Sequence, residues 1–262
     1  MKKIFLFLAF AFTVLVANAW NKTCDEAAVI LASQHLTPAA KSVVDKYLGN
    51  SYADDVKYLY NLEKANEATH SKDIHILHLD KNLKPKSPKK GDAYASINNA
   101  LKVIKAHDSH SPEKVTTALR VVINSICDMH IISNIHIDNI PHSKYDFECL
   151  RFRSDYGKDK EKTLKVVWPA VWAGFNYPRG FSAAYRAYDM KICLDNRYAE
   201  FTKGTLADWA TDNGAMAARY LEIFKPDITV AYMDYMSRED DSYDMLIKAS
   251  CRLAVILNEL LK

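Results

Sequence analysis

Apolar residues recur at helical spacing along most of the chain, and residues that favour helix ends stand at several boundaries. Thr23 is a predicted N-cap, because acidic residues and then apolar residues at helical spacing follow it. Thr37 and Pro38 have the pattern of an N-cap with proline at the first helical position, and Gly49 is a typical stop signal. The pattern therefore predicts two helices before residue 50.

Further segments with helical periodicity span about residues 51–69, 93–107, 115–132, 205–224 and 232–261. The segment 115–132 is the most apolar, so we expect it at the centre of the fold. Residues 74–79 alternate and could be extended, whereas residues 138–165 predict loops with one small hairpin. No Gly/Ser-rich linker divides the chain. The sequence thus predicts an all-α fold, a single-domain helical bundle.

The first residues have the features of a secretory signal. Two lysines precede an apolar run from Ile4 to Val16, and the run ends at a small-x-small cleavage site that finishes at Ala19. The run is too short for a membrane anchor, because ~20 apolar residues are needed to span a bilayer, and no second apolar segment follows it. We therefore predict a signal peptide over 1–19, a domain over 20–262 that begins at Trp20, a periplasmic or secreted location and no membrane span.

Charge and cysteine content narrow the function classes. The chain has 35 basic and 32 acidic residues, two of the basic ones in the signal peptide, so the mature domain is nearly neutral and a large electrostatic nucleic-acid footprint is not predicted. The basic stretch Lys81 to Lys90 favours a solvated linker over a binding patch. The five cysteines form no CxxC pair, and their odd number leaves at least one thiol unpaired or paired between chains.

Common catalytic signatures such as GxSxG, HExxH and the phosphate-binding GxxxxGK are absent from the sequence. Several short segments are distinctive instead; they are Trp20, HLTPAAK at 35–41, SYADD at 51–55, DMH at 128–130 and CRLAVILNELL at 251–261. In order and spacing, these segments resemble the zinc-dependent nucleases of the S-one/P-one type.

The resemblance implies a helical bundle, also found in zinc phospholipase C, around a cleft that holds three zinc ions. Such nucleases cut phosphodiester bonds in single-stranded nucleic acids and often remove 3′-phosphates from nucleotides. The metals lower the pKa of a bound water and hold the phosphate oxygens. The first mature residue is a tryptophan whose amino group and carbonyl oxygen bind zinc, which agrees with cleavage before Trp20.

Four family ligands match residues of this chain, and a fifth has a possible substitute. Trp20, Asp54 and Asp128 match directly, and His75 best matches the following histidine, with His78 as an alternative. Asp25 stands in WNKTCD where the family has a histidine in WGxxGH, and aspartate can still bind zinc. The resemblance therefore implies a remnant metal site at Trp20, Asp25, Asp54, His75 and Asp128.

The other ligand positions have changed. In NSICDMHIISN, Asn124 and Asn134 replace two histidines of the family pattern HxxxDMHxPxH. In TLKVVWP, Lys165 replaces a histidine and Pro169 an aspartate. A lysine brings positive charge, and a proline side chain has no donor atom. The site that Asn134, Lys165 and Pro169 would form should hold no metal.

Simpler explanations accompany several of these residues. Asp54 follows Ser51 by three positions and fits a helix-capping role, and His75 and Asp128 could be retained for hydrogen bonding alone. His130 and His136 are interpreted as surface residues or local contacts. An aromatic set could stack bases but is more typical of core or groove wall; it comprises Trp168, Trp172, Phe175 and Tyr177.

Cys24 and Cys127 adjoin two of the remnant ligands, so the resemblance would place them near each other. They would then form either a disulfide or two buried thiols.

Three hypotheses follow for function. The first is an exported nuclease relative that has lost catalysis and binds a nucleotide or single-stranded nucleic acid in the old cleft, with zinc absent or partial. The second is an active endonuclease or 3′-nucleotidase that uses a reduced metal site. The third is a structural or interaction protein that needs only the helical scaffold. Metal content separates the first two.

Overall fold

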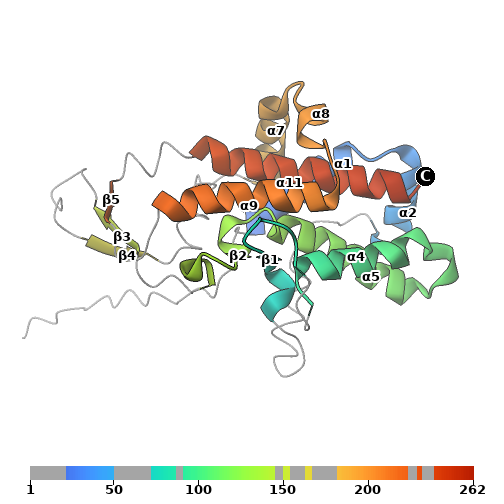
Figure 1. Cartoon of the computed structure of the whole chain (residues 1–262). Coiled ribbons are helices and arrows are strands. Elements are labelled where there is room, and N and C mark those ends of the chain that lie inside the picture. The colour runs from blue at the N-terminus through green and yellow to red at the C-terminus, as the bar shows by residue number, and fades with distance from the viewer. Residues whose placement is uncertain are drawn as a thin grey trace, which may run out of the picture.

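The computed structural model describes residues 22–49, 72–86, 91–144, 150–153, 163–166, 182–223, 229–231 and 239–262. Within these ranges the chain is mostly helical, as predicted (Figure 1). The α-helices of the described ranges are α1 (Lys22–Gln34), α2 (Pro38–Leu48), α4 (Ala93–Lys105), α5 (Pro112–Asp128), α7 (Ala183–Leu194), α8 (Tyr198–Phe201), α9 (Leu206–Ile223) and α11 (Glu239–Leu260).

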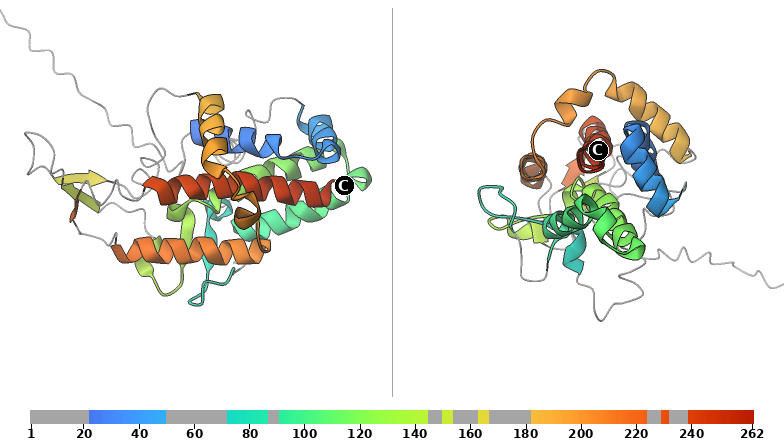
Figure 2. Two further views of the ribbon diagram at one scale, coloured as in Figure 1. Left: turned by 90° about the horizontal axis from the view of Figure 1, so that it is seen from above. Right: turned by 90° about the vertical axis from the view of Figure 1, so that its right-hand side faces the viewer.

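Two small sheets accompany the helices. β1 (Leu77–Leu79) pairs in parallel with β2 (Ile135–Ile137), which confirms an extended segment within residues 74–79. β3 (Leu150–Arg153) pairs antiparallel with β4 (Thr163–Val166), so the predicted small hairpin is present. β5 (Thr229–Ala231), which the sequence did not predict, joins β3 in parallel. The larger sheet lies beyond the ends of α9 and α11 (Figures 1 and 2).

The ends of α2 follow the local sequence signals. The Thr37 hydroxyl accepts a hydrogen bond from the backbone N–H of Ala40 at 3.2 Å, and Pro38 occupies the first turn. Gly49 has a φ of 71°, a conformation that glycine adopts without steric cost, and its N–H donates to the Asp45 carbonyl at 2.9 Å. The boundaries predicted from Thr37 and Gly49 are therefore confirmed.

Helix α11 lies within the helical assembly. Seen end-on, it is surrounded by α1, α7, α9 and the α4–α5 pair (Figure 2). It contacts α1, α2, α4, α5, α7 and α8, while α5 packs chiefly on α4. The buried apolar residues of these elements form one continuous core, so the central position predicted for the most apolar helix is shared by α5 and α11. None of the helices in the described ranges is long and apolar enough to cross a membrane.

The structure corrects one predicted helix boundary. The helix expected to reach about Ile132 ends at Asp128, because the backbone N–H of His130 turns back to the Cys127 carbonyl at 3.0 Å and the chain then enters β2. The last helix, predicted from Tyr232, is described from Glu239 to Leu260, because residues 232–238 lie outside the described ranges, as do the signal segment and the helix predicted over 51–69. Helices α7 and α8 were not predicted.

A buried arginine connects three helices and the segment after α5. Arg252 on α11 is 2% exposed, and its Nε donates to the Phe201 carbonyl at 3.0 Å. Its Nη1 donates to His130 Nε2 at 3.0 Å and to Asn213 Oδ1 at 3.2 Å, and its Nη2 donates to Asp212 Oδ2 at 3.1 Å. Burial lowers the pKa of Arg252 to about 10, although Asp212 raises it. The guanidinium thus satisfies several acceptors within the core.

His130 is part of this network. Of the two interpretations of this residue, a surface position is wrong, whereas a local contact is present alongside the long-range one. It is fully buried, and its Nδ1–H donates to the Ile126 carbonyl at 2.7 Å, which leaves Nε2 to accept from Arg252. Burial and the nearby Arg252 charge hold the pKa of His130 well below its usual value. The surface alternative failed because it treated residue 130 as part of a continuing helix, whereas α5 ends at Asp128.

We expect His130 to make stability depend on acid. In the unfolded chain a histidine takes up a proton as the pH falls through about 6.5, whereas folded His130 stays neutral. His130 therefore contributes its full stabilisation above about pH 6.5. Below that pH the free energy of unfolding falls by up to about 1.4 kcal/mol per pH unit. In urea unfolding between pH 7.5 and 5, the free energy of unfolding should fall less steeply with decreasing pH in His130→Gln than in wild type. The half-buried His110, changed to Gln, provides the control; equal slopes in all three proteins would contradict the assignment.

Candidate functional site

The candidate site is built around Asp128, the last residue of α5. His75 closes a short 3-10 helix (Lys72–His75), and its Nδ1 lies 2.7 Å from Asp128 Oδ2. A carboxylate can only accept, so Nδ1 carries the hydrogen and Nε2 keeps its lone pair. The two side chains are 21% and 18% exposed. Residues 53 positions apart in sequence thus form a direct hydrogen-bonded pair.

Two asparagines flank this pair at positions where the resemblance implies histidines. Asn134 Nδ2 lies 3.5 Å from the other carboxylate oxygen of Asp128, at the outer limit of a hydrogen bond. Asn124, one helical turn before Asp128, donates its Nδ2 to the Arg120 carbonyl of its own helix at 2.9 Å. Both contacts use the amide N–H₂ group as a donor, whereas a metal needs a lone pair.

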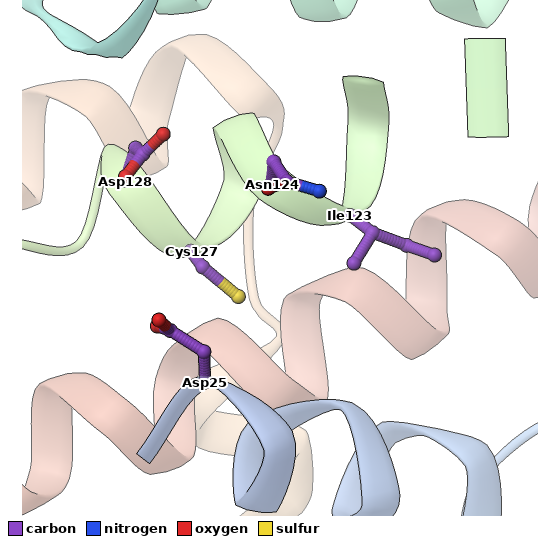
Figure 3. Close-up of a pocket in the computed structure, with 5 residues that line it drawn as sticks. All are labelled: Asp25, Ile123, Asn124, Cys127 and Asp128. Atoms are coloured by element: carbon purple, nitrogen blue, oxygen red, sulfur yellow. The ribbon is translucent and has the colours of Figure 1, made fainter. Parts of the chain in front are cut away.

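A small cavity of about 20 Å³ lies between α1 and α5 (Figure 3). Its lining residues are Asp25, Ile123, Asn124, Cys127 and Asp128. Asp25 rises from α1 toward the face of α5 that carries Cys127 (Figure 3). The volume has room for about one water molecule and is far below the ~300 Å³ of a typical small-molecule site. This cavity by itself is therefore too small for a nucleotide.

The thiol in this cavity, Cys127, forms no disulfide and stays protonated. Cys127 is buried and free, so no disulfide joins it to Cys24, which is also buried. Of the two alternatives, the structure has buried thiols. Burial, followed by the negative charges of Asp25 and Asp128, raises the pKa of Cys127 well above its usual value. The thiolate is the form that attacks substrates or binds metals, so Cys127 is unsuited to either role.

The predicted site residues fall into three groups. His75, Asp128 and Asn134 lie together, and Asp25 and Asn124 line the adjoining cavity with Asp128. Lys165 lies in β4, opposite Arg151 of β3. The remaining predicted residues lie outside the described ranges; they are Trp20, Asp54, Pro169 and the aromatic set Trp168, Trp172, Phe175 and Tyr177.

The described part of this site does not fit the zinc cluster that the resemblance implies. In the ranges that the structure describes, no three His, Cys, Asp or Glu side chains gather where a metal could bind. Zinc in proteins normally has at least three protein ligands, and here only His75 and Asp128 meet. What remains is an Asp–His pair in which Asp128 orients the imidazole, an arrangement that can hold or move one proton at His75 Nε2.

Comparison with protein-family models and with curated proteins finds no match for this chain.

Proposed function

We propose that this chain is an exported relative of the S-one/P-one nucleases that has lost the catalytic zinc cluster. One observation carries the proposal: Asp128 is bonded directly to His75 and approached by the Asn134 amide, where the resemblance implies metal ions and a histidine. The fold would be the helical bundle of that family and of zinc phospholipase C. The loss of ligands converts a metal centre into a hydrogen-bonded polar cluster.

Contacts between the segments that carry the resemblance support the proposal. Asn258, in CRLAVILNELL, accepts from the Thr37 backbone N–H at 2.7 Å and donates to the His35 carbonyl at 2.8 Å, both in HLTPAAK. Arg252, in the same C-terminal segment, bonds His130 of the DMH triplet. Segments that are far apart in sequence therefore share hydrogen bonds, as a common ancestral scaffold would require.

The chemistry of the replaced positions favours binding over hydrolysis. Hydrolysis in such a cleft depends on cations that activate water and neutralise the phosphate. Asn124 and Asn134 offer amide N–H donors, and the thiol of Cys127 stays protonated. The ligand class that we propose for the cleft is a nucleotide or a single-stranded nucleic acid, bound after export to the periplasm or the medium. Hydrogen bonds from neutral amides would hold such a ligand without cleaving it.

Zinc content tests the proposal. The mature protein and an Asp128→Ala variant, each dialysed after exposure to zinc chloride, should retain equal zinc, at most about one ion per chain. A chelator should leave the melting temperature of both within about 2 °C, because no strongly bound metal is linked to folding. Retention of two or three zinc ions by wild type, with loss in Asp128→Ala, would instead support the active nuclease with a reduced site.

A further inference from the structure

A second pair of histidines lies outside the candidate site. His78 on β1 and His136 on β2 face each other in the register of the parallel strand pair. Their ring centres are 5.1 Å apart and their planes are perpendicular. Each side chain is half-buried, so the pair lies near the surface of the small sheet. The interpretation of His136 as a surface or local residue therefore holds only in part, since its ring contacts one from a strand 58 residues away.

One ring nitrogen of this pair lacks an explanation within the described structure. Nε2 of His78 is buried and has no hydrogen-bond partner there. A buried polar atom is nearly always satisfied by a hydrogen bond, a water or an ion. The backbone around it is fully engaged: the His78 N–H donates to Asp92 Oδ2 at 3.1 Å, and its carbonyl accepts from the Lys86 N–H at 2.8 Å. Backbone hydrogen bonds thus hold His78 in place, and its Nε2 has no hydrogen-bond partner among the described residues.

We propose that His78 and His136 form a two-histidine site for a divalent transition-metal ion. Imidazole nitrogens suit Cu²⁺ and Ni²⁺, and Cu²⁺ binds such ligands more tightly than Ni²⁺ does. An ion about 2 Å from one nitrogen of each ring, at an angle between the ~90° of tetragonal sites and the ~109° of tetrahedral sites, holds the ring centres about 4.5–5 Å apart. The observed separation of 5.1 Å lies at the upper end of this range. Water completes the coordination, because the site has two protein ligands.

The charges around the pair favour a cation. The carboxylate of Asp92 is fully buried and bonds the His78 backbone, so it places negative charge beside the site. Lys86, whose backbone N–H donates to the His78 carbonyl, has its Nζ paired with Asp138 Oδ2 at 2.9 Å. Asp138 follows β2 directly, and its N–H donates to the Leu79 carbonyl. The positive charge of Lys86 is thus already paired, and Asp92 offsets part of the charge that a metal would add.

Copper binding tests this site separately from the candidate cleft. Calorimetry with copper chloride should give one site in wild type that weakens at least tenfold in His78→Gln and in His136→Gln. Asp128→Asn and His110→Gln should bind as wild type does, since neither residue belongs to the pair. A loss confined to Asp128→Asn would assign the copper to the candidate cleft and overturn the inference.

Spectroscopy provides a readout that needs no variant. Electron paramagnetic resonance of the copper-loaded wild type should show hyperfine coupling to two imidazole nitrogens. A spectrum without imidazole coupling, or copper affinity unchanged in both histidine variants, would show that the rings form an aromatic pair only. The result is independent of nuclease activity, so the failure of one proposal leaves the other intact.

Discussion

Replacement of Arg252 with alanine is expected to lower the free energy of unfolding by about 3–5 kcal/mol. The guanidinium is 2% exposed, and its removal leaves His130 Nε2, Asn213 Oδ1 and the Phe201 carbonyl without their donor. A buried acceptor that loses its partner costs about 1–3 kcal/mol, because water cannot replace the bond. The truncated side chain also leaves a cavity, which adds to the loss.

Arg197 provides a matched control on the same protein. Its guanidinium bonds Asp244 through two nitrogens at 2.9 and 3.0 Å, but the side chain is 34% exposed. An exposed ion pair contributes at most about 1 kcal/mol, so Arg197→Ala should destabilise far less than Arg252→Ala. Arg252→Met keeps most of the packed stem and should still lose most of the stability, which separates hydrogen bonding from packing.

Urea unfolding monitored by circular dichroism measures these differences. The midpoint should fall for Arg252→Ala and Arg252→Met while the slope with denaturant stays constant, as expected for a change in stability alone. If Arg252→Ala were no more destabilising than Arg197→Ala, the buried network would not contribute to the stability of the core.

Local signals in the sequence predicted most of the described helices, α7 and α8 excepted, but not the contacts between them. Thr37 and Gly49 set the ends of α2 because capping depends on neighbouring residues only. The end of α5 at Asp128 depends instead on pairing of β2 with β1, a partner more than fifty residues earlier. Arg252 lies in an apolar run, so its burial could be suspected, but its acceptors come from three distant segments and are determined by tertiary packing.

The candidate site also combines residues that the sequence predicted with contacts that depend on tertiary packing. The resemblance implied that His75 and Asp128 are neighbours, and the structure places them 2.7 Å apart. Residue types at Asn124 and Asn134 were also visible from the sequence. The direction of each amide was not, because it depends on which backbone carbonyl or carboxylate lies within reach. The pairing of His78 with His136 likewise depends on strand register, which the sequence did not reveal.

Single-stranded DNA, RNA and 3′-nucleotides incubated with zinc and the purified protein should be hydrolysed no faster than with the Asp128→Ala variant. Metal ions in such a cleft contribute several kcal/mol of transition-state stabilisation, so their loss corresponds to about a thousandfold or more in rate. The described residues supply only His75 and Asp128 together, and Asn134 directs its amide at the same carboxylate.

Restoring one ligand should not restore this activity. Asn124→His would place an imidazole one turn before Asp128, but the positions of Asn134, Lys165 and Pro169 would still lack the family's histidines and aspartate. Because the cations act together on the water and the phosphate, a single recovered ligand leaves the cluster incomplete. Zinc-dependent cleavage by the unmodified protein that disappears in Asp128→Ala would show that the remnant site is sufficient for catalysis. Cleavage that persists unchanged in Asp128→Ala would point to a contaminating nuclease, because every proposed metal position beside His75 depends on that carboxylate.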